Sequence, residues 1–156
     1  MSNFYLSAAR PVTVLSQSGA PSSVTGTTSE TVLATIAIPA GAVGPNGAIR
    51  VTTLWSYTNN SNNKILFTRL GGVSVQGITN TTTSAMTQQI VIRSRGTSTS
   101  QITEFNSTSG FGSAAAGNFA TTVDMTKAQN LTLSGAVAVG TDTITLEGYT
   151  VEILNP

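Results

Sequence analysis

The sequence predicts an all-β fold of the sandwich or barrel class. Apolar and polar residues alternate with a period of two along most of its 156 residues, which is the pattern of strands that bury one face. These short runs are separated at fairly regular spacing by turns rich in Gly, Pro and Asn, and no long stretch has a helical period. Such a series of short strands is typical of a sandwich or a barrel.

The clearest alternation lies in the first half of the chain. We expect strands at Glu30 to Ile38, Ile49 to Tyr57 and Lys64 to Leu70. Between the first two, the stretch Pro39 to Gly47 contains two Pro and three Gly, which predicts a turn. Between the second and third lies the Asn-rich stretch Asn59 to Asn63, and we expect a hairpin there because turn residues join two strongly patterned strands.

The second half contains further runs at Met86 to Arg95, Gln101 to Phe105, Phe119 to Met125, Asn130 to Val139 and Thr143 to Leu154. In the last run, the positions of the apolar residues change parity around Gly148, which predicts a β-bulge at that glycine. Val12 to Leu15 has its own alternation and is a candidate first strand. The expected total is eight or nine strands.

The chain length suits one domain, and we divide it into two parts. Residues 1–29 are predicted to form an N-terminal strand and a flexible arm, because the stretch 16–29 reads SQSGAPSSVTGTTS. Residues 30–156 are predicted to form the β-sandwich. Phe4, Tyr5 and Leu6 are three large apolar residues in a row, which suit no single-faced strand. We therefore expect these three to be buried against another chain.

Charge is scarce in this sequence. Charged residues make up 8% of the chain and the net charge is +1, whereas an ordinary soluble domain has roughly 25% charged residues. Nucleic-acid binding needs a basic stripe that neutralises phosphates, and none is present. So few charges also do little to keep separate copies apart. We therefore expect a protein that functions inside an assembly and has no nucleic-acid partner.

The chain contains no Cys and no His. This removes thiolate and imidazole groups as metal ligands, nucleophiles and general bases. We expect neither an enzyme nor a cofactor or metal site. No window approaches the roughly 18 apolar residues that a membrane span needs, and residues 1–10 lack the pattern of an export signal. We expect no membrane partner and a protein that is made and kept in a cytoplasm.

Two motifs could in principle carry chemistry. Ser61-Asn62-Asn63-Lys64 has the S-x-x-K spacing of penicillin-recognising enzymes, but it lies in the Asn-rich turn rather than at the start of a helix. We interpret it as a solvated turn. Several carboxylates could supply the acid pair of a glycosidase, but they occur singly in polar surroundings, and we interpret them as solvated surface groups. They are Glu104, Asp124, Asp142, Glu147 and Glu152.

Trp55 continues the apolar series of Ile49 and Val51, and we expect it in the core. Tyr57 is nearer the turn and is expected to be half exposed. Arg93 and Arg95 are two residues apart on one predicted strand, so they should point the same way. Two interpretations of this pair stay open: contact with a partner chain through the planar guanidinium groups, or protection of an edge strand by charge.

The stretch Glu30 to Gly72, ETVLATIAIPAGAVGPNGAIRVTTLWSYTNNSNNKILFTRLGG, resembles a segment of small virion proteins of tailed bacteriophages. The shared features are an alternating strand, a Gly/Pro/Asn turn, a strand ending in LWSYTNN, an Asn-Lys step and a strand that closes with Gly-Gly. The resemblance implies an antiparallel β-sandwich of jelly-roll type. It covers about the middle quarter to third of the chain and assigns no site residues.

The resemblance also implies a role. It suggests a capsid decoration or cement protein that lies on the surface of the virion, is assembled in the host cytoplasm, contacts the major capsid protein and forms a homotrimer. The alternative within such phages is a tail-fibre or adhesin-like module that binds carbohydrate. That alternative requires an exposed aromatic platform, which we would expect around Tyr57 or Tyr149.

Overall fold

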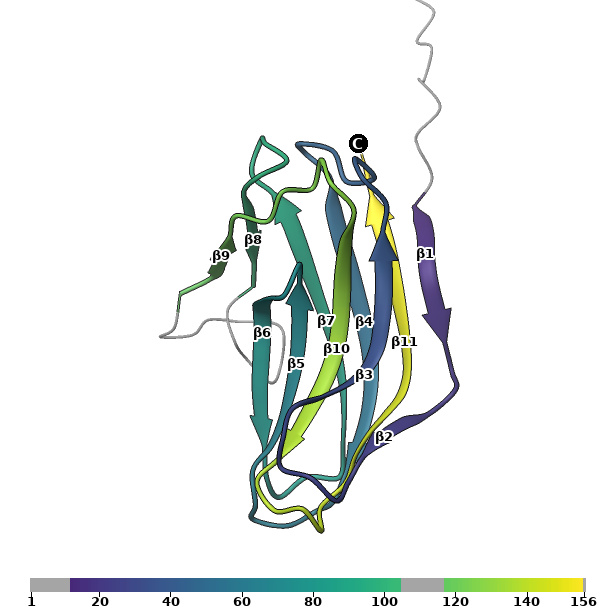
Figure 1. Ribbon diagram of the computed structural model, residues 1–156, viewed down its shortest axis with the longest axis vertical. Helices are drawn as coiled ribbons and strands as arrows, with labels where there is room; N and C mark the ends of the chain where they lie inside the picture. Colours follow the sequence, from purple (N-terminus) through teal and green to yellow (C-terminus); the bar gives the residue numbers. More distant parts are fainter. Residues whose placement is uncertain (1–11, 105–116, 156) are drawn as a thin grey trace, which may run out of the picture.

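The computed structural model describes residues 12–104 and 117–155, which form a two-layered β-sandwich (Figure 1). Every strand pairing in these ranges is antiparallel, so the predicted all-β antiparallel sandwich is confirmed. The eleven strands are β1 (Thr13–Ser18), β2 (Ser22–Val24), β3 (Thr31–Ile38), β4 (Ala48–Tyr57), β5 (Lys64–Leu70), β6 (Val73–Asn80), β7 (Ala85–Ser94), β8 (Gln101–Thr103), β9 (Phe119–Thr121), β10 (Gln129–Val137) and β11 (Ile144–Leu154).

The strands belong to two sheets. Sheet A has the order β1-β11-β4-β7-β8-β9, with β2 also paired to β11, and sheet B has the order β3-β10-β5-β6. Consecutive strands often lie in different sheets, so the chain crosses repeatedly from one layer to the other. The last two strands enter the middle of each sheet: β10 lies between β3 and β5, and β11 lies between β1 and β4.

Two expectations about connections and strands are corrected. The stretch Asn59 to Asn63 joins β4 of sheet A to β5 of sheet B, so it crosses the sandwich instead of closing a hairpin. The described residues also form eleven strands, where eight or nine were expected. The unforeseen strands are β2 and β6, and β2 lies in the stretch 16–29 that was interpreted as a loop or arm.

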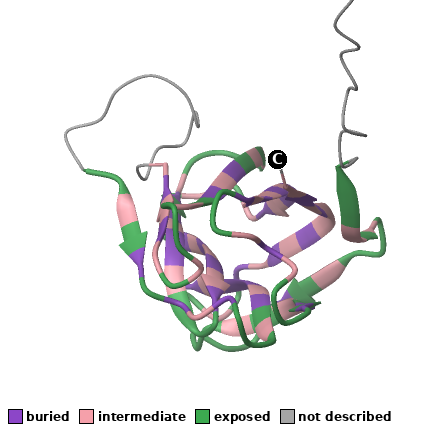
Figure 2. Ribbon diagram, turned by 90° about the horizontal axis from the view of Figure 1, so that it is seen from above, coloured by how far each residue is buried: buried purple, intermediate pink, exposed green. Residues whose placement is uncertain are grey.

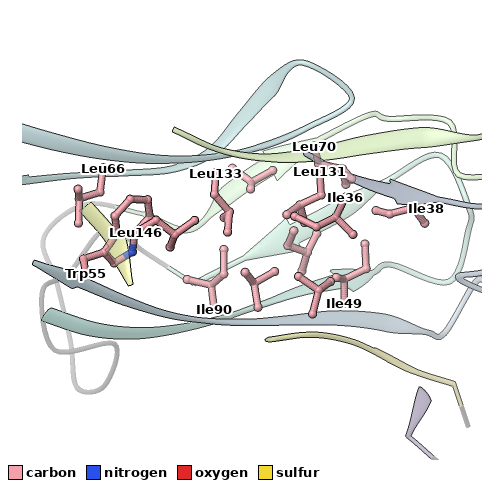
Figure 3. Close-up of a cluster of buried hydrophobic side chains, with 14 of the residues drawn as sticks. Ile36, Ile38, Ile49, Trp55, Leu66, Leu70, Ile90, Leu131, Leu133 and Leu146 are labelled. Carbon is pink, nitrogen blue, oxygen red and sulfur yellow. The ribbon is translucent and has the colours of Figure 1, made fainter. Parts of the chain in front are cut away.

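The core fills the space between the two sheets. Figure 2 shows buried residues concentrated in the interior of the sandwich and exposed residues on its outer surfaces. In Figure 3, Leu66 and Leu133 of sheet B face Trp55 and Ile90 of sheet A. Trp55 is 1% exposed, and its indole N–H donates to Thr53 Oγ1 at 2.8 Å, so the prediction that Trp55 is in the core is confirmed.

The prediction for Tyr57 is wrong. Its side chain is buried rather than half exposed, and its hydroxyl is hydrogen bonded to Thr83 Oγ1 at 2.9 Å. The physical reason is that Tyr57 has the same strand parity as Trp55, so it faces inward. The hydrogen bond satisfies the polar end of the buried ring.

The predicted bulge in β11 is present. Leu146 is paired with Trp55, but the next paired residue of β11 is Gly148, which lies opposite Leu54. The extra residue changes the parity of the strand, so Leu146 before the bulge and Val151 after it both point into the core.

Candidate interaction surface

The outer face of sheet A has a hollow at the end of the sandwich where β1 begins and β11 ends. Its volume is about 600 Å³. The floor consists of outward-pointing side chains on three neighbouring strands: Leu154 of β11, Ala48 of β4 and Val91 of β7. We call it the terminal hollow, and it is lined by Val12, Asn46, Gly47, Ala48, Arg50, Gln89, Val91, Arg93, Ser94, Leu154 and Asn155.

Both arginines of the terminal hollow are neutralised within the chain. Arg50 Nε lies 2.6 Å from Glu152 Oε2 on the neighbouring strand, and Arg93 Nη1 lies 2.7 Å from Glu104 Oε1. The hydrogen bond from Arg50 lowers the pKa of Glu152 below its ordinary value, although partial burial acts in the opposite direction. The terminal hollow therefore presents apolar side chains and paired charges, with no strong net field.

The Arg93–Glu104 pair also protects an incomplete strand pairing. Ile102 of β8 is paired with Arg93 of β7, but β8 ends at Thr103, before Glu104 could continue the ladder opposite Val91. The side chains complete the pairing instead: Val91 N–H donates to Glu104 Oε2 at 2.8 Å, and Val91 C=O accepts from Arg93 Nη1 at 3.2 Å. This arrangement supports the edge-protection interpretation for Arg93.

Arg95 has a different environment. Strand β7 ends at Ser94, so Arg95 lies in the turn to β8 and not, as expected, on the same strand as Arg93. Its backbone N–H donates to the carbonyl oxygen of Ser100. Among the lysines and arginines in residues 12–104 and 117–155, Arg95 alone has no side-chain partner. Contact of Arg93 and Arg95 with a partner chain stays a prediction.

Exposed apolar residues adjoin the terminal hollow. Val12 is 49% exposed and lines the hollow, and Val14 is 50% exposed on β1, opposite Glu152. Strand β1 is one edge of sheet A in the part of the chain that the structure describes. An edge strand with exposed valines favours association with another chain. Phe4, Tyr5 and Leu6 lie outside the described residues, so their predicted burial between chains stays a prediction.

The interpretation of Ser61 to Lys64 as a solvated turn is wrong for Lys64. This side chain is 0% exposed, and its Nζ donates to the carbonyl oxygen of Asn60 at 3.0 Å and to Asn60 Oδ1 at 2.8 Å. Lys64 has the same strand parity as Leu66 and Leu70, so the alternation itself places it inward. That parity is the sequence signal for its burial.

Asp142 completes this buried polar network and is likewise not a solvated carboxylate. It is 2% exposed and accepts hydrogen bonds from Asn60 Nδ2 at 2.6 Å and Asn62 Nδ2 at 2.9 Å. The bond from Asn62 is the main reason why the pKa of Asp142 lies below its ordinary value, with smaller contributions from Asn60 and the charge of Lys64. The network ties the β4–β5 connection to the β10–β11 turn. Its groups bond to one another, so its evident role is structural.

The other four carboxylates of the predicted set are each bonded to their own neighbours. Glu104 and Glu152 are paired with Arg93 and Arg50 on the outer face of sheet A. Asp124 is hydrogen bonded to Thr126 and lies 3.4 Å from Lys127, and Glu147 accepts a hydrogen bond from Ser56. No group of three or more acidic, His or Cys side chains that could hold a metal ion occurs within residues 12–104 and 117–155.

A second, smaller hollow lies further along the same outer face. Its volume is about 280 Å³, and its lining includes Tyr149, Thr52, Thr87 and the exposed Leu54. Tyr149 is half-buried, and its hydroxyl lies 3.3 Å from Ser16 Oγ. Of the two tyrosines considered for an aromatic platform, only Tyr149 therefore reaches the surface. We call this the Tyr149 hollow.

No helix in the described residues has the length and apolar character that crossing a bilayer requires. No family model matches the sequence, and no curated protein matches it.

Among solved structures, the chain shows weak similarity to dimeric latent PorU from Porphyromonas gingivalis, with 9% identity and a TM-score of 0.42 over 96% of this chain and 14% of that one. It also shows weak similarity to a structure of infectious bursal disease virus, Gt strain, with 14% identity and a TM-score of 0.27 over 93% of this chain and 42% of that one. The chain thus spans less than half the length of either. Both TM-scores are below 0.5, so neither similarity carries an argument about function.

Proposed function

We propose that this chain is a viral structural protein that decorates and stabilises the capsid of a tailed phage, as a homo-oligomer bound to the major capsid protein on the virion surface. One observation carries the proposal: an exposed apolar edge, Val12 and Val14, adjoins a hollow whose charges are already paired within the chain. Such a surface is suited to burial against protein.

Two further features support a structural role. The stretch Glu30 to Gly72 resembles virion proteins of tailed phages, as described above. The described surface has few charges, and its ion pairs lie within the chain, so another subunit can cover it with little desolvation of unpaired charge. In this proposal the protein adds buried interface to the shell, and it catalyses no reaction.

The direct test is the number of copies per particle and their position. Quantitative mass spectrometry of purified virions should give hundreds of copies, and a density map should place the sandwich on the outside of the shell. A handful of copies at the tail would contradict capsid decoration.

A shortened chain that begins at Ala8 tests the role of Phe4, Tyr5 and Leu6. Because β1 begins at Thr13, we expect the shortened chain to fold and to melt at nearly the same temperature. We expect its affinity for bare capsids to fall at least about tenfold, or about 1.4 kcal/mol. Equal decoration by both chains would show that these residues are not an anchor.

The Tyr149 hollow favours one second candidate, a carbohydrate-binding module of a tail fibre or adhesin. A half-buried tyrosine beside threonine hydroxyls can stack on a sugar ring and hydrogen bond to its hydroxyl groups. Binding to surface glycans, measured on immobilised host polysaccharide, should then be lost in Tyr149→Ala and kept in Phe67→Ala, another half-buried aromatic, on sheet B. Absence of glycan binding by the unaltered chain would exclude this candidate.

A further inference from the structure

We infer that the terminal hollow of one copy binds residues 1–11 of a second copy of this chain. The inference goes beyond capsid decoration and can fail or hold independently of it, because the contact would also form between free subunits in solution.

The first support is the place where the segment joins the sandwich. Val12, which directly follows residues 1–11, lines the terminal hollow. Strand β1 then runs away from that end, since Thr13 lies opposite Ile153 and Ser18 lies opposite Tyr149. The junction between residues 1–11 and the described chain therefore lies at the hollow end of the sandwich, next to the surface that we assign to this segment.

The second support is the direction and length of residues 1–11. To enter its own hollow, the segment would have to reverse direction immediately before β1. Pro11 restricts the preceding Arg10 to extended conformations, which disfavours such a tight reversal. Eleven extended residues span up to about 36 Å, which is enough to reach the terminal hollow of a copy packed alongside.

The third support is chemical complementarity. The floor of the hollow is apolar, with Ala48, Val91 and Leu154, and its two arginines are satisfied by Glu152 and Glu104. The segment MSNFYLSAARP has one charged side chain and three consecutive large apolar residues. The apolar residues of this segment gain more from the hollow than a highly charged partner would, because the hollow offers no unpaired counter-charge.

The contact has a consequence for assembly. A segment of one copy that fills a hollow on the next is a head-to-tail interface, which makes a ring when the rotation closes and a filament when it does not. A ring of three would agree with the trimer that the resemblance implies.

Disulfide trapping tests the contact, because the chain has no Cys of its own. Chains with a single cysteine at Phe4, Tyr5 or Leu6 are each mixed with an Ala48→Cys chain and oxidised mildly. We expect a heterodimer joined between the segment and residue 48, identified by mass spectrometry of the linked peptides. The control replaces Ala48→Cys by Ala37→Cys, an exposed alanine on sheet B, and should give no specific heterodimer. Equal cross-linking to residues 48 and 37, or none to residue 48, would overturn the inference.

A chain with both Tyr5→Cys and Ala48→Cys distinguishes two cases: exchange, in which residues 1–11 bind the hollow of another copy, and binding to the hollow of the same copy. Exchange should give a ladder of linked chains on a non-reducing gel, whereas a closed monomer with an internal disulfide would overturn the inference.

In sedimentation experiments, Ala48→Trp should fill the hollow and shift the oligomer towards the 16.0 kDa single chain, and Ala37→Trp should not. An unchanged oligomer in Ala48→Trp would also overturn the inference. Capsid binding is measured in a separate experiment. A failure of capsid decoration would therefore not change the conclusion about contact between copies in solution.

Discussion

Lys64 is the fully buried cation in the described part of the chain, and it occupies a position where the alternation of β5 calls for an apolar residue. Its burial is tolerated because two of its ammonium protons are bonded to oxygens of Asn60 and because Asp142 contributes a nearby negative charge. The Asn-rich neighbourhood of Lys64 predicts a solvated turn, whereas the parity of β5 predicts burial, and the parity is decisive.

Replacement of Lys64 by Met tests this account. The apolar stem is kept, but the part-buried carbonyl oxygen and Oδ1 of Asn60 lose the hydrogen bonds from Lys64, and Asp142 loses a nearby positive charge, which should lower the free energy of unfolding by about 1–3 kcal/mol. Urea denaturation measures the change. The matched control is Lys127→Met, because Lys127 is exposed and its replacement should change stability by less than about 0.5 kcal/mol. Equal effects of the two substitutions would contradict the structural role of Lys64.

Two neighbouring residues of β4 test which face of the strand is buried. Trp55 is 1% exposed between the sheets, and Leu54 is 47% exposed on the outer face of sheet A. Trp55→Ala should leave a cavity and cost about 3–5 kcal/mol. Leu54→Ala should cost less than about 1 kcal/mol, because little of its surface is buried. Chemical denaturation of both variants measures the contrast. A larger loss of stability in Leu54→Ala than in Trp55→Ala would contradict the assignment of the buried and exposed faces of β4.

Among the elements, the strongly alternating strands were predictable and the weak ones were not. β4 and β5 alternate between buried and less buried residues along their whole length, because each packs one face against the opposite sheet. β3 and β10 alternate over part of their length, and the pairing between them has a register shift. β6 reads VSVQGITN, in which Gln76 is buried and Val73 is exposed, so its alternation is masked. β2 has three residues, too few for any pattern.

The connection at Asn59 to Asn63 was misassigned for a related reason. Turn residues between two strands predict a reversal of the chain but not whether the next strand pairs with the last or crosses to the other sheet. The candidate surface was harder still to predict. Its lining combines Val12, which directly precedes β1, with residues of β4, β7 and β11, and only the sheet order brings these together. Arg93 was singled out from the sequence, but its bond to Glu104 was not.

The bulge in β11 gives a prediction about how closely two strands pack. A Cβ atom at Gly148 would lie 3.0 Å from the carbonyl oxygen of Ser18 and 3.6 Å from Gly19 Cα, so β11 passes close to the end of β1. Gly148→Ala should destabilise the protein by about 1–3 kcal/mol through this crowding. Gly19→Ala is the control, since nothing lies within 4 Å of its Cβ position, and it should be neutral or slightly stabilising. Thermal unfolding of both variants checks the contrast.

For the whole molecule, the charges determine how stability depends on pH. The pKa values of Glu30, Asp124, Asp142 and Glu152 lie below their ordinary values, mainly because of hydrogen bonds from Arg69, Thr126, Asn62 and Arg50 respectively. As pH falls, the unfolded chain therefore takes up protons before the folded one does. Stability is complete above the ordinary values of 4.5 for Glu and 3.8 for Asp, and it decreases as pH falls through the lower folded values.

We therefore expect the urea midpoint to be nearly constant between about pH 6 and pH 8, because the chain has no histidine to titrate there. The midpoint should fall steadily below about pH 4.5. Glu30→Gln should make that acid slope shallower, because Glu30 contributes through its bonds with Arg69 and Ser134. A midpoint that rises on acidification would contradict this account.

The central positions of β10 and β11 constrain when the protein can fold during synthesis. Until residues 129–154 have left the ribosome, β4 lacks its β11 neighbour, β3 and β5 have no strand between them, and β1 and β2 have no partner. A chain that stops early therefore has open strand edges and an unclosed core, which proteases and chaperones recognise. In the proposed assembly, only copies translated through β11 could present the terminal hollow, which is lined by Val12 and residues of β4, β7 and β11, so the order of the strands would exclude incomplete chains.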